Sequence, residues 1–143
     1  MIKLADTRLL RTSAYVNGTW MAAQSGKTLE VRNPANADLL GTVPDCGGAE
    51  TRTAIEAAEA ALPAWRARTA SDRAALLRRL HALILANQED LATLMTAEQG
   101  KPLAEARGEI AYAAAFVEWF AEEARRVYGD VIPGHAKDRR IVV

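Results

Sequence analysis

The chain has 143 residues, which is the length of one ordinary domain. It carries 18 Lys and Arg residues against 18 Asp and Glu residues, and this balance gives no electrostatic reason to bind nucleic acid or an anionic membrane. No apolar run reaches the roughly 20 residues that span a bilayer. The single cysteine, Cys46, excludes a disulfide within the chain and favours a reducing, cytoplasmic location.

The first part of the chain favours short antiparallel strands. Strand-forming residues flank Asn17-Gly18, a pair that accepts the positive φ angles of a type I′ hairpin turn. Residues 28–31 and 39–43 predict two further strands, because a turn that contains proline separates them. We expect a small antiparallel layer here rather than a self-sufficient sheet.

Beyond residue 48 the apolar residues recur at helical spacing, and Ala, the residue with the highest helix propensity, becomes abundant. The pattern predicts four helices, near 49–62, 71–86, 88–99 and 102–127. The expected helix boundaries lie at capping or helix-breaking residues: Pro63, Ser71, Asp72, Asn87, Gly100, Pro102 and Gly129. The fold class is therefore mostly α, with short antiparallel β-hairpin strands at the N-terminus.

Apolar stripes on these helices should face a common core. The expected stripe residues are Ala54, Ile55, Ala58, Ala61 and Leu62 on the first helix, Leu76, Leu77, Leu80, Leu83 and Ile84 on the second, and Leu91, Leu94 and Met95 on the third. Because aromatic residues make up only 6% of the chain, we expect a thin core for an isolated domain of this size.

The last residues, 139–143, predict a β-strand with no later strand to pair with. An apolar edge strand is usually covered in natural proteins. Either another chain covers Ile141, Val142 and Val143, or the sequence stops inside a larger protein, and we favour the second interpretation. In the first case we expect the segment to be disordered or paired with another molecule and the protein to self-associate, and in the second we expect the strand to be ordered against residues that follow.

Residue types alone indicate no active site. Cys46 is interpreted as an ordinary loop residue, because no histidine lies near it in the sequence. His81 and His135 are far apart and lack further ligands at zinc-binding spacing. Glycine-rich phosphate loops are absent from the sequence. The acidic residues of the fourth helix predict a solvated face balanced by arginines: Glu105, Glu109, Glu118, Glu122 and Glu123, with Arg107, Arg125 and Arg126.

Several short segments nevertheless match one protein family in order and spacing. They are YVNGTW at 15–20, VRNPA at 31–35, AWR at 64–66, EQGKPLAEA at 98–106, EI at 109–110, FVEWFAEE at 116–123 and YGDVIPG at 128–134. Together they resemble the aldehyde dehydrogenase superfamily, and most closely its bacterial NAD(P)-dependent succinate-semialdehyde dehydrogenase branch. The likeness runs from Leu9 to Val143.

The resemblance implies that the chain is a fragment of the α/β aldehyde dehydrogenase fold. Residues 1–128 correspond to the N-terminal layer of the cofactor-binding domain, and residues 129–143 begin a strand of the oligomerisation domain. In the family, the catalytic cysteine, the general-base glutamate, the oxyanion asparagine and the dinucleotide-binding segment lie beyond the position of Val143. We therefore expect no catalytic and no cofactor-binding residue in this chain, and Cys46 does not align with the nucleophile.

The implied activity belongs to the full-length protein: NAD- or NADP-dependent oxidation of succinate semialdehyde to succinate. Its implied partners are the remainder of the same polypeptide or identical subunits, together with a small aldehyde substrate. The chain alone is expected to be inactive and to bind neither NAD nor NADP. The alternative is a non-catalytic helical interaction module derived from the same family.

The resemblance also implies two sites inside the chain. The fourth helix lines the substrate access tunnel in related enzymes, at positions that correspond to Gly108 and Tyr112, with Phe116 as a third candidate. The helical spacing equally allows Tyr112 and Phe116 to be core residues. Some family members also bind a monovalent cation, and the corresponding ligands here are the main-chain carbonyls of Val31 and Arg32 and the carboxylate of Glu98.

Overall fold

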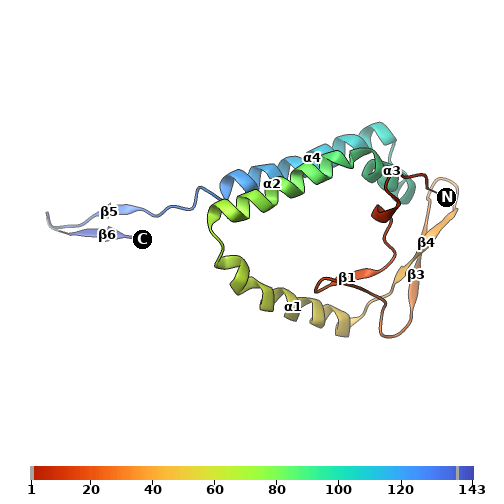
Figure 1. Ribbon diagram of the computed structural model, residues 1–143, viewed down its shortest axis with the longest axis horizontal. Helices are drawn as coiled ribbons and strands as arrows, with labels where there is room; N and C mark the ends of the chain where they lie inside the picture. Colours follow the sequence, from red (N-terminus) through yellow and green to blue (C-terminus); the bar gives the residue numbers. More distant parts are fainter. Residues whose placement is uncertain (1, 138) are drawn as a thin grey trace.

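A computed structural model describes residues 2–137 and 139–143 of the protein. Within these residues the chain forms four α-helices, one 3-10 turn and three pairs of short antiparallel strands (Figure 1). In chain order they are η1 (Thr7–Leu9), β1 (Ala14–Val16), β2 (Thr19–Met21), β3 (Thr28–Arg32), β4 (Leu39–Pro44), α1 (Gly48–Arg66), α2 (Ala70–Ala86), α3 (Gln88–Gln99), α4 (Leu103–Glu123), β5 (Val131–Pro133) and β6 (Arg140–Val142). The predicted, mostly helical fold class is confirmed.

The first hairpin has the turn that its sequence predicts. Asn17 and Gly18 both have positive φ angles, 49° and 78°, and they join β1 to β2 in register. The second hairpin, β3–β4, is longer and less regular. Its pairing is in register as far as Val31 opposite Gly41 and then shifts, so that Arg32 pairs with Leu39. Leu40 is the extra residue of this β-bulge.

Helix α1 does not end at Pro63, as the sequence analysis expected. It continues through Pro63 to Arg66, and the N–H of Ala67 donates to the carbonyl of Pro63. Proline removes one helical hydrogen bond, but in the last turn of a helix this loss is small because few later bonds depend on it. The prediction that Pro63 breaks the helix was therefore wrong.

Two other helix boundaries also differ from the prediction. Thr69, rather than Ser71 or Asp72, caps α2, because its hydroxyl accepts the N–H of Asp72 at 3.1 Å. Helix α4 ends at Glu123, one turn before the expected end at Val127. Gly100 does end α3, with a left-handed φ of 75° that favours glycine.

The core lies where α4 packs against α2 and α3, and it is built largely from alanine. Ala92, Ala106 and Ile110 form its centre, with partly buried Leu91 and Met95 beside them. Small side chains let the helix axes approach closely, but they bury little apolar area. The expectation of a thin core is confirmed.

Most of the larger apolar residues assigned to the stripes do not lie in this core. Ile55 and Leu62 of α1 are 62% and 49% exposed, because α1 packs mainly against β1 and not against the other helices. On α2 the stripe residues Leu76, Leu80 and Leu83 are also exposed. The prediction of one common core was therefore wrong for α1 and for much of α2.

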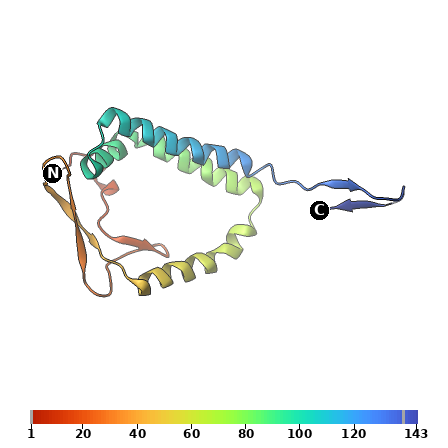
Figure 2. The ribbon, with the colours of Figure 1, turned by 180° about the vertical axis from the view of Figure 1, so that it is seen from behind.

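The elements form an open ring with a projecting arm. Helix α1 lies across from the α2–α4 bundle, with the β1–β2 hairpin beside it (Figures 1 and 2). The β3–β4 hairpin and the segment before β1 close the ring on the side of α3. The predicted C-terminal strand does have a partner: β6 pairs antiparallel with β5, which the sequence analysis missed. This hairpin projects from the bundle, and its apolar residues Val131, Ile141 and Val142 are exposed. Among the described residues, none of the helices is both long enough and apolar enough to cross a membrane.

Candidate functional site

Helix α4 presents an aromatic face on the side opposite to its buried alanines. Tyr112 and Phe116 lie one turn apart with their rings edge to face, at a centroid distance of 4.8 Å and an angle of 83°. They are 67% and 48% exposed, so in this structure they are not the core residues that the alternative interpretation allowed. Gly108 lies one turn earlier, is exposed, and has open space where a side chain would begin.

The aromatic face extends beyond the residues that sequence reasoning singled out. Trp119 and Phe120 line the same shallow hollow of about 310 Å³ with Tyr112, Ala115 and Phe116. Helical spacing could have identified both residues, because positions three and four residues after Phe116 lie on the same face of a helix. Rings without charged neighbours in the hollow can hold the apolar part of a small molecule or another protein segment. The Tyr112 hydroxyl offers a hydrogen bond there.

A second, much smaller cavity lies between β3–β4, α3 and the N-terminal segment. Its volume of about 20 Å³ exceeds the roughly 10–15 Å³ that one water molecule, or an ion of similar radius, needs. It is lined by Leu10, Arg11, Thr12, Val31, Leu40, Gly41, Val43 and Glu98. The structure thus brings together two of the three predicted cation ligands, Val31 and Glu98, from elements far apart in the sequence.

The immediate surroundings of this cavity combine the carboxylate of Glu98 with the cationic side chain of Arg11. Val31 and Arg32 have ladder partners on either side of the bulge, Gly41 and Leu39, and only Leu40 is left unpaired. Among the described residues, Glu98 forms no ion pair, and its side chain is exposed. The guanidinium of Arg11 lies over the ring of Trp20, 4.9 Å from its centroid. Arg32 is not in the cavity wall, and its side chain binds Glu30 instead.

The helix N-termini, the usual binding places for phosphate, all carry acidic residues. Glu50 stands in the first turn of α1, Asp72 in that of α2, Asp90 in that of α3 and Glu105 in that of α4. Glu50 is buried, and its carboxylate accepts the N–H groups of Gln24 at 2.7 Å and Gly47 at 2.9 Å. A carboxylate in the first turn of a helix occupies the positive end of the helix dipole and repels the charge of a phosphate.

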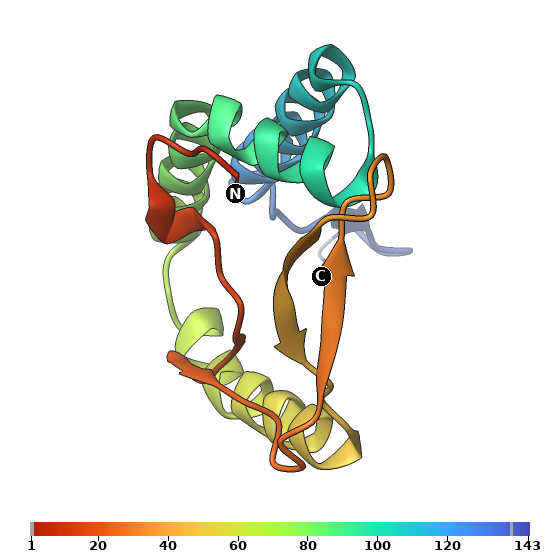
Figure 3. The ribbon, with the colours of Figure 1, turned by 90° about the vertical axis from the view of Figure 1, so that its right-hand side faces the viewer.

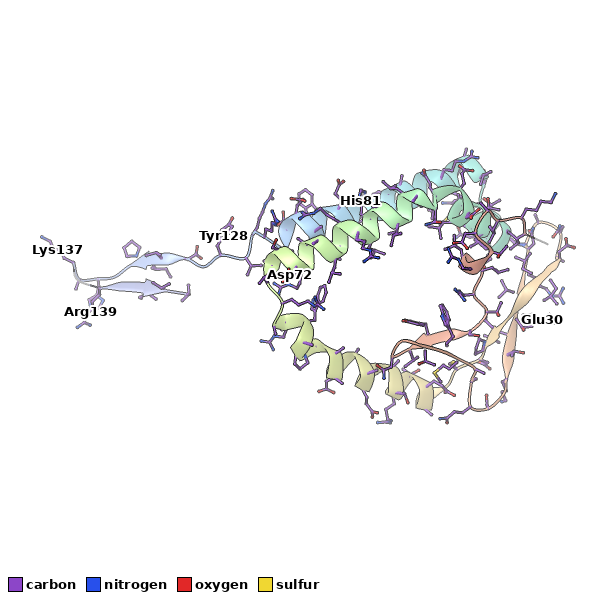
Figure 4. The ribbon with its side chains drawn as sticks, in the orientation of Figure 1. Glu30, Asp72, His81, Tyr128, Lys137 and Arg139 are labelled. Atoms are coloured by element: carbon purple, nitrogen blue, oxygen red, sulfur yellow. The ribbon has the colours of Figure 1, made fainter. Side chains whose placement is uncertain are left out.

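The remaining candidate residues lie apart from both cavities. Cys46 is exposed in the loop between β4 and α1. His81 lies on α2, and Lys137 and Arg139 lie at the far end of the β5–β6 hairpin (Figure 4). His135 is exposed in the connection of the same hairpin.

The charged residues of α4 make ion pairs that differ in part from those expected. Arg107 pairs with Glu89 of α3, and Arg125 donates to the hydroxyl of Ser71. Of the expected acidic residues, Glu109 pairs with Lys101, Glu122 with Arg78 and Glu123 with Arg126.

Comparison with known proteins gives the same family as the sequence segments. The profile of the aldehyde dehydrogenase family matches residues 20–143. Glutarate-semialdehyde dehydrogenase of Pseudomonas putida is 62% identical over 142 residues, and NADP(+) succinate-semialdehyde dehydrogenase of Escherichia coli strain K12 is 58% identical over 142 residues. In both cases the match covers 99% of this chain and 30% of the relative.

A solved structure agrees over the same extent. The aldehyde dehydrogenase from Brucella melitensis is 51% identical and superimposes with a TM-score of 0.96, covering 99% of this chain and 29% of that one. The chain therefore spans about 30% of the length of the curated relatives that it matches. Because the family profile covers most of the sequence and the backbone superimposes almost throughout, the chain belongs to the aldehyde dehydrogenase family.

Proposed function

We propose that this chain is the N-terminal part of an NAD(P)-dependent aldehyde dehydrogenase that oxidises succinate semialdehyde to succinate. The observation that carries the proposal is the high identity to two semialdehyde dehydrogenases over 99% of the chain. Both relatives are named for semialdehydes of dicarboxylic acids, and the name of the second also specifies NADP(+). The proposed location is the cytoplasm.

In this proposal the chain supplies a scaffold and one wall of the substrate path. Residues 1–128 are the N-terminal layer of the cofactor-binding domain, and residues 129–143 begin the oligomerisation strand. Gly108, Tyr112 and Phe116 line the access tunnel. The exposed rings on α4 support this role, because an apolar wall guides the carbon chain of a small aldehyde without trapping its charge.

The residues of this chain do not fit the pyrophosphate of a dinucleotide. A pyrophosphate favours helix N-termini with free amides and no negative charge. Every α-helix of the described chain has a carboxylate in its first turn, and that of Glu50 already accepts the backbone N–H groups of Gln24 and Gly47. We therefore propose that residues beyond Val143 hold NAD(P) and react with the aldehyde, and that the chain alone is inactive.

The cavity beside Glu98 lies where the family resemblance implies a monovalent cation. Its volume suffices for one ion and Glu98 offers a carboxylate, although Arg11 also lines it and Arg32 does not. Hard cations prefer such oxygen ligands. We propose that Glu98 and the carbonyls of Val31 and Arg32 hold the ion, which would tie α3 to the β3–β4 hairpin.

A chimera tests the proposed activity. This chain replaces the matching 142 residues of the Pseudomonas putida relative, and oxidation of succinate and glutarate semialdehydes is followed through formation of NADH or NADPH. We expect activity from the chimera and neither turnover nor nicotinamide binding from the 143-residue chain alone. A folded chimera without activity, next to an active parent, would refute the proposal. So would turnover by the isolated chain.

The exposed aromatic face supports a second candidate function, a non-catalytic helical interaction module. Four large rings on one helix face exceed what a monomeric surface normally leaves in water. If this second function holds, the double substitution Phe116→Ser with Trp119→Ser abolishes binding to a partner protein in cells that lack the rest of the dehydrogenase. If the first proposal holds, the same two substitutions lower only the dehydrogenase activity of the chimera that carries them.

A further inference from the structure

A short, conformationally restricted link joins α3 to α4. Figure 3 shows this link at the edge of the helical layer, beside the tip of the β3–β4 hairpin. Gly100 ends α3 with its left-handed φ, and its N–H donates to the carbonyl of Thr96 at 2.9 Å. Pro102 has a φ of −54°, and its carbonyl accepts the N–H of Ala106 at 2.9 Å. Because the residues on both sides of Lys101 are held in this way, its backbone has a fixed direction.

The side chain of Lys101 reaches the second turn of α4 and pairs with Glu109 there. Its ammonium donates to Oε1 of Glu109, eight residues later in the sequence. The side chains of Lys101 and Glu109 are 26% and 45% exposed, so the lysine end of the pair is largely shielded from water. Water and salt weaken such a pair less than a fully exposed one. The pair therefore places a positive charge at a defined point on α4.

Glu109 lies on the same face of α4 as the aromatic hollow. Tyr112 and Phe116 follow it three and seven residues later, and these spacings return to one side of a helix. Gly108, which has open space where a side chain would begin, immediately precedes it. The ion pair thus stands at the N-terminal end of the face that we propose as a wall of the substrate path.

A second carboxylate lies at the same end of this face. Glu105 is exposed, precedes Glu109 by about one helical turn, and forms no ion pair among the described residues. None of the five residues that line the hollow is charged. Lys101 therefore supplies a positive charge that partly balances two carboxylates at the point where the aromatic wall begins.

We propose that Lys101 is a positioning residue for an anionic substrate: by neutralising Glu109, its ammonium lets an aldehyde that carries a carboxylate approach along the aromatic face. The inference rests on the proposed function, because the semialdehyde of a dicarboxylic acid carries this charge. Without Lys101, the carboxylates of Glu105 and Glu109 repel the substrate, and without Glu109 the ammonium attracts it. A unit charge about 7 Å from the substrate carboxylate changes its affinity about threefold in bulk water, and more where water is partly excluded.

Steady-state kinetics of the full-length chimera test this proposal. Lys101→Met keeps the aliphatic stem and removes the positive charge, whereas Glu109→Gln keeps the shape and removes the negative charge. We expect the KM for succinate semialdehyde to rise about threefold to tenfold in Lys101→Met and to fall by a similar factor in Glu109→Gln, with kcat nearly unchanged in both. Because both substitutions break the same ion pair, structural damage alone would move the two KM values in the same direction.

Further measurements separate charge from structure. Arg107 lies two residues before Glu109, on a different side of α4, and Arg107→Met removes its ion pair with Glu89. We expect this variant to keep the KM of the unsubstituted chimera. The double variant, Lys101→Met with Glu109→Gln, should also return to a KM near that value. Raising the ionic strength should narrow the difference between the unsubstituted chimera and each single variant at Lys101 or Glu109.

The two proposals fail in different ways. Opposite KM shifts in the two single variants, recovery in the double variant and no shift in Arg107→Met support the role of Lys101. Any other combination in an active chimera overturns this role and leaves the proposed function standing. A folded chimera without activity overturns both. If Lys101→Met does not fold, Glu109→Gln and the double variant carry the test, and the proposal fails unless the first lowers the KM and the second restores it.

Discussion

Replacing Gly100 by Ala should loosen the contact between the end of α3 and the β3–β4 hairpin, on which the approach of Glu98 to Val31 depends. Gly100 has a φ of 75°, and an alanine in this left-handed region costs about 1–2 kcal/mol. Its Cβ would lie only 2.9 Å from Cγ of Pro34, and the shift that this overlap forces costs about 1–3 kcal/mol. We expect a total loss of about 2–5 kcal/mol in the free energy of unfolding.

Gly26 is the matched control for this substitution. It has a similar φ of 68°, but nothing lies within 4 Å of the position of its Cβ, so Gly26→Ala carries the backbone strain without the overlap. Urea unfolding followed by circular dichroism gives both free energies. A double-mutant cycle with Pro34→Ala should recover part of the loss at Gly100 and none at Gly26. A loss in Gly100→Ala no larger than that in Gly26→Ala would refute the reasoning.

Three further substitutions test other parts of the fold. The backbone N–H of Gln24 and that of Gly47 hold the pKa of Glu50 below its usual value. The Glu50 carboxylate therefore stabilises the fold at pH values above its pKa in the unfolded chain. This stabilisation is lost as the pH falls through its pKa in the folded chain. Glu50→Gln should therefore flatten the acid limb of a stability–pH profile, and parallel limbs would contradict this. Ala114→Leu should cost about 1–3 kcal/mol through overpacking between helices, whereas Ala111→Leu on the exposed side of α4 should be nearly neutral, as melting curves will show. Val142→Lys should weaken self-association through the exposed β5–β6 hairpin, and an unchanged sedimentation profile would count against that role.

The features that the sequence analysis located correctly are those that depend on neighbouring residues alone. The Asn17-Gly18 turn and the left-handed Gly100 follow from backbone sterics, which act within a few residues. Helix limits were less accurate, because Pro63 is tolerated in a last turn and Thr69 competes successfully with Ser71 as a cap. The partner strand β5 was missed because its three residues lack a turn signal such as Asn17-Gly18, which identified the equally short β1 and β2.

The two candidate sites differ in the same way, because one lies on a single helix face and the other depends on packing between distant elements. Tyr112 and Phe116 share one helix face, and the same periodicity could have added Trp119 and Phe120. The meeting of Val31 with Glu98 is different, because it depends on the packing of α3 against a hairpin more than fifty residues earlier, and only the family resemblance suggested it. Neither periodicity nor resemblance indicated that the carboxylate of Asp90 accepts the backbone N–H groups of Ala5 and Asp6. A single acidic residue at a helix start has the same sequence pattern whether it is a cap or an anchor.

The failure of the stripe prediction has a physical cause that bears on the proposed function. Helix α4 buries a row of alanines against α2 and α3 and carries four aromatic rings on its other side, and α2 likewise exposes Leu76, Leu80 and Leu83. Periodicity detects apolar faces but does not indicate which of two faces meets a neighbour within the same chain. A helix that is apolar on opposite sides is typical of the interior of a larger protein. Under the proposed function these second faces meet the rest of a longer dehydrogenase, with Tyr112 and Phe116 along the substrate path, and the chimera tests whether both faces of α4 are used at once.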